Sequence, residues 1–163
     1  MDREEVLHLY DTYSDDVYRL AYSFFLNPHD AEDAVQEVFL RLMSRNLTLM
    51  PDKEQALLAR ITANYCKDCL RKNKRSANMT EADDCRIVSG DSAERLELQE
   101  LLKELPPIYR AVLYLHYYVG YKPAEIARIL AITPSGVFMR LSRARKLLKA
   151  ELGDENIANN LYL

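Results

Sequence analysis

The chain has 163 residues, of which 48% are hydrophobic and 29% charged, and it contains four glycines and no tryptophan. This length allows one domain or two small helical ones, and the abundance of Leu, Ala, Glu, Lys and Arg predicts an all-α protein. No run of eighteen apolar residues occurs and the first ten residues are acidic, so we expect neither a membrane span nor a signal peptide, and a cytoplasmic protein without membrane insertion.

Charge is distributed unevenly along the chain, although the formal net charge is only −3. Residues 1–59 hold five Lys or Arg against twelve Asp or Glu, and residues 76–108 hold three against eight. Residues 60–75 hold six basic residues against one acidic, and residues 109–163 hold eight against four. Two basic blocks separated by acidic ones predict two phosphate-facing surfaces and one surface suited to a protein partner.

Apolar residues at helical spacing predict three helices in the acidic first part. A short helix over residues 4–12 is followed by one that Ser14 or Asp15 caps and that ends near Asn27. The third helix begins around His29 and has an apolar face of Ala31, Ala34, Val35, Val38, Phe39 and Leu42. Its other face presents Asp30, Asp33, Gln36, Glu37 and Arg41. The helix dipole explains acids in the first turn but not Gln36 and its neighbours.

A long helix is predicted from about Asp52 to Lys74. Its second half gathers Arg60, Lys67, Arg71, Lys72, Lys74 and Arg75. This basic end can bind phosphates, but basic residues at a helix C-terminus also complement the dipole and are often only solvated. Both interpretations remain open from this segment alone.

Cys66 and Cys69 form a C-x-x-C spacing within the same helix. A zinc site needs four ligands, and no second pair is evident because His8, His29 and His116 are scattered. One helical turn apart, such thiols often act as small core hydrophobes. We therefore expect no metal and no cofactor, and keep a thiol sensor as an alternative.

Residues 76–91 are small, polar and acidic without a sustained period, which predicts a flexible linker between two domains, residues 1–75 and 92–163. Asp91 and Glu94 then form a capping-box-like start to a leucine-rich helix. A further helix, IYRAVLYLHYYV, follows a proline pair and stops at Gly120.

Residues 122–149 predict two helices joined by a tight corner. Pro123 suits the first position of one helix, while Thr133 and Pro134 suit the N-cap and first position of the next. We expect Ala124, Ile126, Ala127 and Leu130 to form the apolar side of the first helix. This helix-turn-helix arrangement places a second helix in the major groove of DNA.

Winding that second helix at about 100° per residue separates two faces. The buried stripe comprises Val137, Leu141, Ala144 and Leu148. The outer face and its flanks carry Ser135, Phe138, Met139, Arg140, Ser142, Arg143, Arg145, Lys146 and Lys149. A short-polar, cationic front suits base edges and phosphates, although an ordinary amphipathic helix with a solvated basic face has the same pattern.

Three motifs occur in order across both predicted domains. They are DAEDAVQEVFLRL at residues 30–42, the I-x-x-N-x-x-x-D-x-x-R spacing of Ile61, Asn64, Asp68 and Arg71, and the run from LPPIYRAVLYL to RLSRARKLL. Together they resemble the extracytoplasmic-function type of bacterial RNA polymerase sigma factor, over nearly the entire chain. The resemblance implies a region 2-like domain and a region 4-like helix-turn-helix domain, and a protein that binds core RNA polymerase and directs promoter-specific initiation.

The resemblance also implies a role for each surface. Core-polymerase docking, on the clamp coiled coil of the largest subunit, falls to Asp30, Asp33, Gln36, Glu37 and Phe39. Recognition and opening of the minus-ten element falls to Asn64, Lys67, Asp68, Arg71, Lys72 and Arg75. Reading of the minus-thirty-five element falls to Thr133, Ser135, Phe138, Met139, Arg140, Ser142, Arg143 and Lys146. An anti-sigma protein, which holds many such factors, is a further expected partner.

The chain departs from the family pattern in its helix-turn-helix. Ala131 stands where the family usually has Gly, and GVFMRL at residues 136–141 stands where it often has T-V-K-S-R-L. Met139 cannot donate hydrogen bonds, so we expect an atypical upstream element read with more apolar contact. The alternative is that an anti-sigma protein covers Phe138 and Met139.

Two other function classes fit the sequence less well. A stand-alone helix-turn-helix regulator is the second candidate, but it needs no polymerase-docking helix ahead of a basic one. No nucleophile, base and orienting residue recur at informative spacing, so we expect no catalytic residues.

Overall fold

The computed structural model describes residues 1–76, 100 and 102–152, without the side chains of residues 75, 76 and 150–152. The chain divides into two compact units, Met1–Cys85 and Arg86–Leu163. All regular elements among the described residues are helices, which confirms the predicted fold class. The predicted linker beyond Ser76 and the predicted capping box lie outside the described residues.

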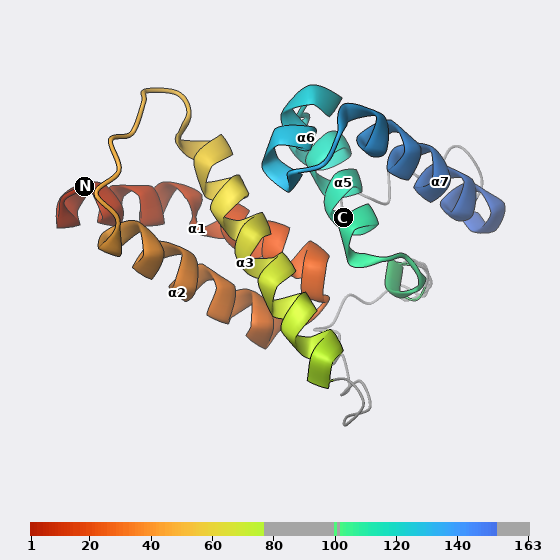
Figure 1. The fold of residues 1–163 in the computed structure, drawn as a ribbon, viewed down its shortest axis with the longest axis horizontal. Coiled ribbons are helices and arrows are strands. Elements are labelled where there is room, and N and C mark those ends of the chain that lie inside the picture. The colour runs from red at the N-terminus through yellow and green to blue at the C-terminus, as the bar shows by residue number, and fades with distance from the viewer. Residues whose placement is uncertain (77–99, 101, 153–163) are drawn as a thin grey trace. The chain divides into compact units, whose positions relative to one another are not determined.

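The first unit is built from three helices, α1 (Arg3–Phe25), α2 (Pro28–Ser44) and α3 (Glu54–Ser76). Each of them packs against the other two (Figure 1). The apolar faces meet in a core of Val6, Leu9, Val17, Val35, Val38, Phe39, Leu42, Leu58 and Ile61. Burial of these side chains is the main driving force for the unit, since each contributes roughly 1.5–3 kcal/mol.

The first helix is continuous, so the prediction of two helices divided near Ser14 was wrong. It begins with a capping box, in which Asp2 accepts a hydrogen bond from the Glu5 amide at 2.9 Å and Glu5 accepts one from the Asp2 amide at 3.0 Å. Val6 and Val17, before and after the expected break, are buried in one core. Packing of that shared face outweighs the weak local preference of Ser14 for a cap.

The second helix starts at Pro28, close to the predicted position. Asn27 is its N-cap, and the side-chain oxygen of Asn27 accepts hydrogen bonds from the amides of His29 at 2.9 Å and Asp30 at 3.2 Å. Leu26, just before this cap, adopts a left-handed backbone with φ of 51° and ends α1. The two caps together reverse the chain so that α2 packs against α1.

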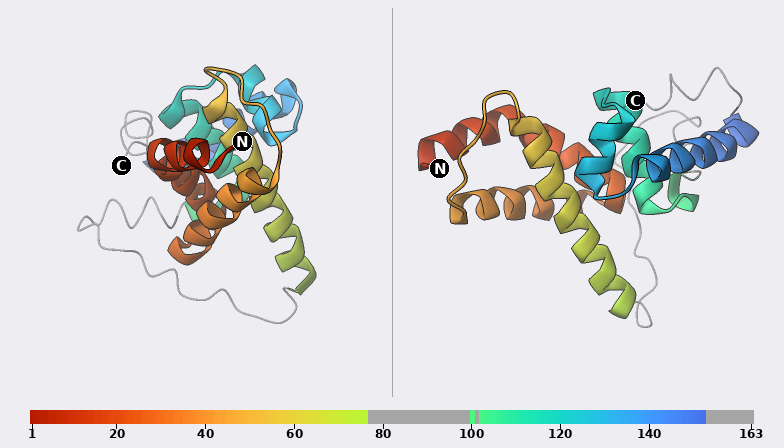
Figure 2. Two further views of the ribbon diagram at one scale, coloured as in Figure 1. Left: turned by 90° about the vertical axis from the view of Figure 1, so that its left-hand side faces the viewer. Right: turned by 45° about the horizontal axis from the view of Figure 1, so that its top comes forward.

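The third helix is longer than the core that it packs against. Its buried residues end at Cys66, whereas all four residues from Arg71 to Lys74 are exposed. Figures 1 and 2 show this end of α3 extending beyond α1 and α2. A helix exposed on all sides presents its charged groups to solvent or to a partner rather than to a core.

The second unit contains α5 (Pro107–Leu113), a π-helical segment η1 (Tyr114–Val119), α6 (Pro123–Leu130) and α7 (Pro134–Leu152). The helix predicted to stop at Gly120 does so, and Gly120 has a φ of 89°, a conformation that glycine adopts without strain. Its amide and that of Tyr121 both donate to the Leu115 carbonyl, at 3.1 and 3.0 Å. The π-helical geometry of the second half was not predicted.

Arg110, in α5, is a buried charged residue of this unit. It is 8% exposed, and its Nη1 donates to the carbonyl oxygens of Leu105 at 2.7 Å and Leu102 at 3.2 Å. These carbonyls belong to the end of the preceding helical segment, where a cation is favourable. This charge was counted in the second basic block, but it ties α5 to its neighbour instead of facing a phosphate.

The helix-turn-helix forms as predicted from its capping residues. Thr133 is the N-cap of α7, since its Oγ1 accepts a hydrogen bond from the Gly136 amide at 3.0 Å. The predicted stripe of Val137, Leu141, Ala144 and Leu148 is buried, with no member more than 3% exposed. In α6 the buried residues are Ile126, Ala127, Ile129 and Leu130, whereas Ala124, expected on this face, is exposed.

Ala131, at the corner, is held in a conformation that favours glycine. Its φ is 54°, in the left-handed region. Replacing it by Gly should stabilise α6 and α7 by roughly 1 kcal/mol, because the Cβ clash is removed. Hydrogen exchange of amides in α6 and α7 should slow by about fivefold.

The matched control is Ala124→Gly, at an exposed helical position of α6. There glycine lowers helix propensity, so exchange should become faster. Faster exchange in the Ala131→Gly protein would contradict the left-handed corner.

Candidate nucleic-acid and protein interfaces

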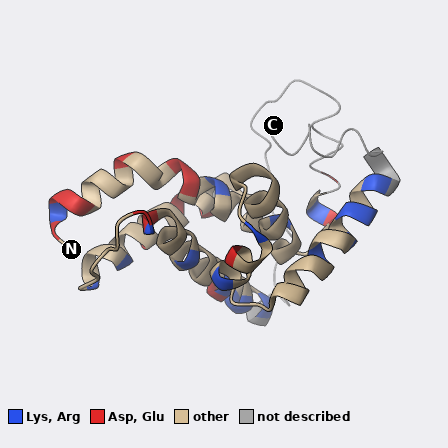
Figure 3. Cartoon of the chain, turned by 90° about the horizontal axis from the view of Figure 1, so that it is seen from above, with Lys and Arg blue, Asp and Glu red and all other residues tan. Residues whose placement is uncertain are grey.

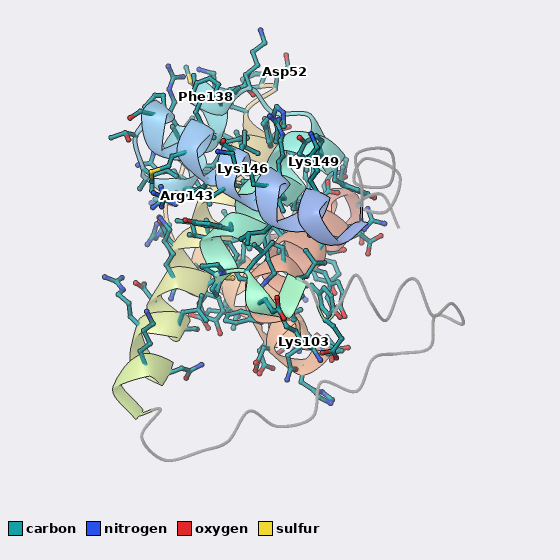
Figure 4. All side chains as sticks on the ribbon, turned by 90° about the vertical axis from the view of Figure 1, so that its right-hand side faces the viewer. Asp52, Lys103, Phe138, Arg143, Lys146 and Lys149 are labelled. Atoms are coloured by element: carbon teal, nitrogen blue, oxygen red, sulfur yellow. The ribbon has the colours of Figure 1, made fainter. Side chains whose placement is uncertain are left out.

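The outer face of α7 carries most of the side chains predicted to face DNA. Thr133, Ser135, Ser142, Arg143 and Lys146 are exposed. Phe138 is 60% exposed and Met139 42%, although both are large and apolar. Figure 4 shows Phe138, Arg143, Lys146 and Lys149 following one another along the helix. The buried stripe on the opposite side therefore turns this mixed apolar and cationic surface outward.

Arg140 differs from the other predicted contacts, because it folds back onto its own helix. Its Nη1 donates to the Gly136 carbonyl at 3.0 Å, and its Nε is buried without a hydrogen-bond partner among the described residues. A Cβ at position 136 would lie 2.9 Å from that Nη1. The glycine therefore leaves the space that this guanidinium occupies, and Arg140 is half-buried.

The rest of α7 forms a cationic edge. Arg143 donates to the hydroxyl of Tyr109 at 3.4 Å, and Arg145 hydrogen-bonds the hydroxyl of Tyr117, with its guanidinium carbon 5.3 Å from the centre of that ring. Between residues 134 and 149 the helix has five basic residues and no acidic one. Figure 3 shows these charges spaced along α7. Such an edge suits a phosphate backbone.

The free end of α3 is the second basic surface. Asn64, Arg71 and Lys72 are exposed, and Lys67 is half-exposed. Asp68 forms an ion pair with Arg71 one turn on, so its carboxylate holds that guanidinium on the surface of the helix. Lys74 is also exposed, while the side chain of Arg75, a predicted contact, lies outside those described.

The exposed face of α2 is apolar as well as acidic. Asp33 and Gln36 are exposed as predicted, and Leu40 and Met43 are 59% and 55% exposed. Steps of three and four residues place all four on one side of the helix. We call this set the α2 stripe. Sequence reasoning missed Leu40 and Met43, although their spacing from Gln36 could have identified them.

The other expected docking residues have different surroundings. Asp30 is exposed in the first turn of α2. Glu37 is half-buried and forms a salt bridge of 3.1 Å with Arg41, whose guanidinium carbon lies 5.2 Å from the centre of the Tyr65 ring. The contact between Arg41 and Tyr65 joins α2 to α3, and Glu37 holds the Arg41 guanidinium that makes this contact.

Phe39 corrects the expected docking set. It is 6% exposed, belongs to the core, and contacts the ring of Tyr10 edge-on with 5.0 Å between centroids. A ring buried in this way cannot serve as the surface contact that was expected of it. Its apolar character and spacing with Val35 and Leu42 were the better guide.

The cysteine pair is part of the packing. Cys66 is fully buried, and burial raises the pKa of its thiol well above the ordinary value, with a smaller effect from Cys69. Cys69 is partly exposed.

Within the described ranges, no three His, Cys, Asp or Glu side chains come together as metal ligands would. None of the described helices has the length and apolar character needed to span a membrane.

Comparison with known proteins shows similarity over both units. Residues 9–76 match the sequence model described as Sigma-70 region 2, and residues 95–148 match that described as Sigma-70, region 4. RNA polymerase sigma factor SigV of Bacillus subtilis is 32% identical over 146 residues, 88% of either chain. ECF RNA polymerase sigma factor SigW of the same species is 30% identical over 171 residues, covering 94% of this chain and 91% of the relative.

A solved structure has the same fold. It is that of the sigma factor RpoE in complex with the anti-sigma factor NepR from Bartonella quintana, with a TM-score of 0.74. The superposition covers 94% of this chain and 97% of that one at 21% sequence identity.

The buried thiol leads to a test of the thiol-sensor alternative. Because its pKa is raised, Cys66 stays protonated at neutral pH, and the thiolate is the reactive form. Alkylation of Cys66 in the native chain at pH 8 should be at least about tenfold slower than in urea, as followed by mass spectrometry of the labelled peptides. Equal rates in both conditions would contradict the burial and favour a sensor.

Proposed function

Because the chain belongs to the sigma-70 family, as an RNA polymerase sigma factor of the extracytoplasmic-function type, we propose that α2, α3 and α7 divide promoter recognition between them. The protein binds core RNA polymerase and directs promoter-specific initiation of transcription. It supplies specificity to the polymerase rather than chemistry of its own. The observation that carries the division is the occurrence, in one chain, of an apolar and acidic stripe, a protruding basic helix end and a helix-turn-helix.

The α2 stripe is the surface that docks on core polymerase. Leu40 and Met43 supply exposed apolar area, and Asp33 and Gln36 extend the stripe with polar groups toward the N-terminus of α2. Protein interfaces usually combine exposed apolar side chains with neighbouring polar groups. Negative charge at Asp33 also suits a positively charged partner and repels DNA.

The protruding end of α3 engages the minus-ten element. Arg71, Lys72 and Lys74 are exposed beyond the core, so they can follow a phosphate backbone without disturbing the packing. Asn64, two turns before Arg71 on the same side of α3, can hydrogen-bond a base that has left the stack. Asp68 restrains Arg71 and is a positioning residue.

The helix-turn-helix reads the minus-thirty-five element as duplex DNA. Its second helix enters the major groove by its N-terminal half, while Arg143 and Lys146 contact phosphates. Residues 76–91 join this domain, residues 92–163, to the first one, residues 1–75. A linker of this length lets both domains reach elements that lie far apart on one promoter.

A stand-alone regulator fits these features less well. Such a protein needs the helix-turn-helix but neither the α2 stripe nor a basic helix end on a separate unit. Matches to both sigma regions in the expected order leave that alternative disfavoured.

The docking proposal predicts the outcome of run-off transcription. Purified core polymerase should give a specific start on the upstream region of this gene only when the protein is added. The double variant Gln36→Ala, Leu40→Ala should bind core polymerase about tenfold more weakly, because two central contacts are lost. Its far-ultraviolet circular dichroism should be unchanged, since both side chains are exposed.

Met50→Ala provides the matched control, because Met50 is 63% exposed but belongs to the loop that connects α2 and α3, outside the α2 stripe. Its affinity for core polymerase should equal that of the unmodified protein. By contrast, Phe39→Ala should lower the free energy of unfolding by about 3 kcal/mol. If Gln36 and Leu40 can be changed without weakening co-elution on polymerase, the stripe is not the docking surface.

The basic end of α3 gives a salt-dependent prediction. Lys74→Ala should weaken promoter binding by the polymerase complex at every promoter sequence alike. It should also reduce the slope of log affinity against log salt by about 1, because one phosphate contact is removed. Affinity for core polymerase should not change; a loss of that affinity instead would place α3 in the docking surface.

A further inference from the structure

Two large apolar side chains stand at the start of the helix that faces DNA. Phe138 and Met139 are the fifth and sixth residues from the Thr133 cap, and they are 60% and 42% exposed. The first turns of a recognition helix are the part that contacts base edges. Exposed apolar groups at such a position indicate contact with an apolar group on the partner.

The same part of the helix lacks the side chains that read bases by paired hydrogen bonds. Residues 134–139 include no Arg, Lys, Asn or Gln, and Ser135 is their only side chain with a polar group. Arg140, the next candidate, is held by its hydrogen bond to the Gly136 carbonyl. The space for that contact exists because Gly136 has no Cβ, which would lie 2.9 Å from the guanidinium. Bidentate recognition of guanine or adenine is therefore absent from these turns.

The charges around this pair identify the partner as DNA. Arg143 and Lys146 are exposed on the same side of α7, and no acidic residue occurs between residues 134 and 149. These cations complement a phosphate backbone, which would position the helix without reading sequence. Phe138 and Met139 are then the largest exposed side chains in the first turns of α7 that are available to contact base edges.

We propose that Phe138 and Met139 read thymine C5-methyl groups in the upstream promoter element. The C5-methyl group is the only apolar group that a base pair exposes in the major groove. Successive helical residues diverge by about 100°, so the two side chains reach different base pairs on either side of Ser135. The proposal rests on the proposed function, in which α7 enters the major groove at that element.

The test removes single methyl groups from the DNA. The preferred upstream element is first selected from random sequence with the complete polymerase complex. Each thymine of that element is then replaced by deoxyuridine, which lacks the methyl group but keeps every hydrogen-bonding group. At one or two positions the apparent affinity of the complex should fall about fourfold, as expected for one buried methyl group. Deoxyuridine outside the element should have no effect.

Protein variants then identify which side chain contacts each thymine methyl group. Phe138→Ala should weaken binding to the thymine promoter and reduce the thymine-to-uracil affinity ratio at one position to about 1. Met139→Ala should do the same at a different position. Leu147→Ala is the matched control, because Leu147 is 54% exposed on α7 but lies about four turns from the N-cap. Both ratios should be retained in this variant.

Each outcome separates this proposal from the function on which it rests. A ratio near 1 at all thymines, with sequence-selective initiation intact, overturns the methyl readout and leaves the apolar pair to a protein partner. Unchanged ratios in Phe138→Ala and Met139→Ala overturn the assignment to these residues. Initiation that does not depend on any upstream element refutes the role of α7 in promoter reading, and the proposal with it.

Discussion

Burial of one stripe of α7 determines what the rest of the second unit can do. Val137, Leu141, Ala144 and Leu148 are enclosed by the unit, which sets the rotation of the helix about its axis. Every other side chain of α7 takes its direction from that rotation. The Thr133 cap sets where the helix begins, and so which residues lie in its first turns. A helix rotated by one residue would bury Phe138 and expose Val137.

Separation of charge gives the surfaces their different partners. The basic residues of α3 are concentrated beyond its last buried residue, and those of α7 other than Arg140 are exposed away from its apolar stripe. Acidic residues are concentrated on α1 and the start of α2, as Figure 3 shows for α1. Like charge disfavours nucleic acid there, so these helices are left for protein contact. The net charge of the chain is small because acidic residues balance two basic surfaces, each of which suits a phosphate backbone.

Several predictions were correct because they depended on local chemistry. The caps at Thr133 and Gly120 follow from hydrogen bonding and backbone freedom within a few residues. The continuity of α1 was missed because the cost of a helical Ser14 is small, while burial along the whole helix is large. The α2 stripe was identified only in part, since an exposed Leu and a buried Phe look alike in sequence and only packing distinguishes Leu40 from Phe39.

The sequence by itself determined the helical class, the start and end of most helices, the buried stripe of α7 and, through three ordered motifs, the family. Periodicity and capping are short-range properties, so a single chain is sufficient to read them. Only the tertiary structure decided which charged and apolar groups remain available. Arg110 hydrogen-bonds carbonyls at the end of a helical segment, and Arg140 hydrogen-bonds the Gly136 carbonyl. Phe39 is buried in the core. Their availability depends on groups that folding brings within a few ångströms, and neither residue type nor spacing specifies those neighbours.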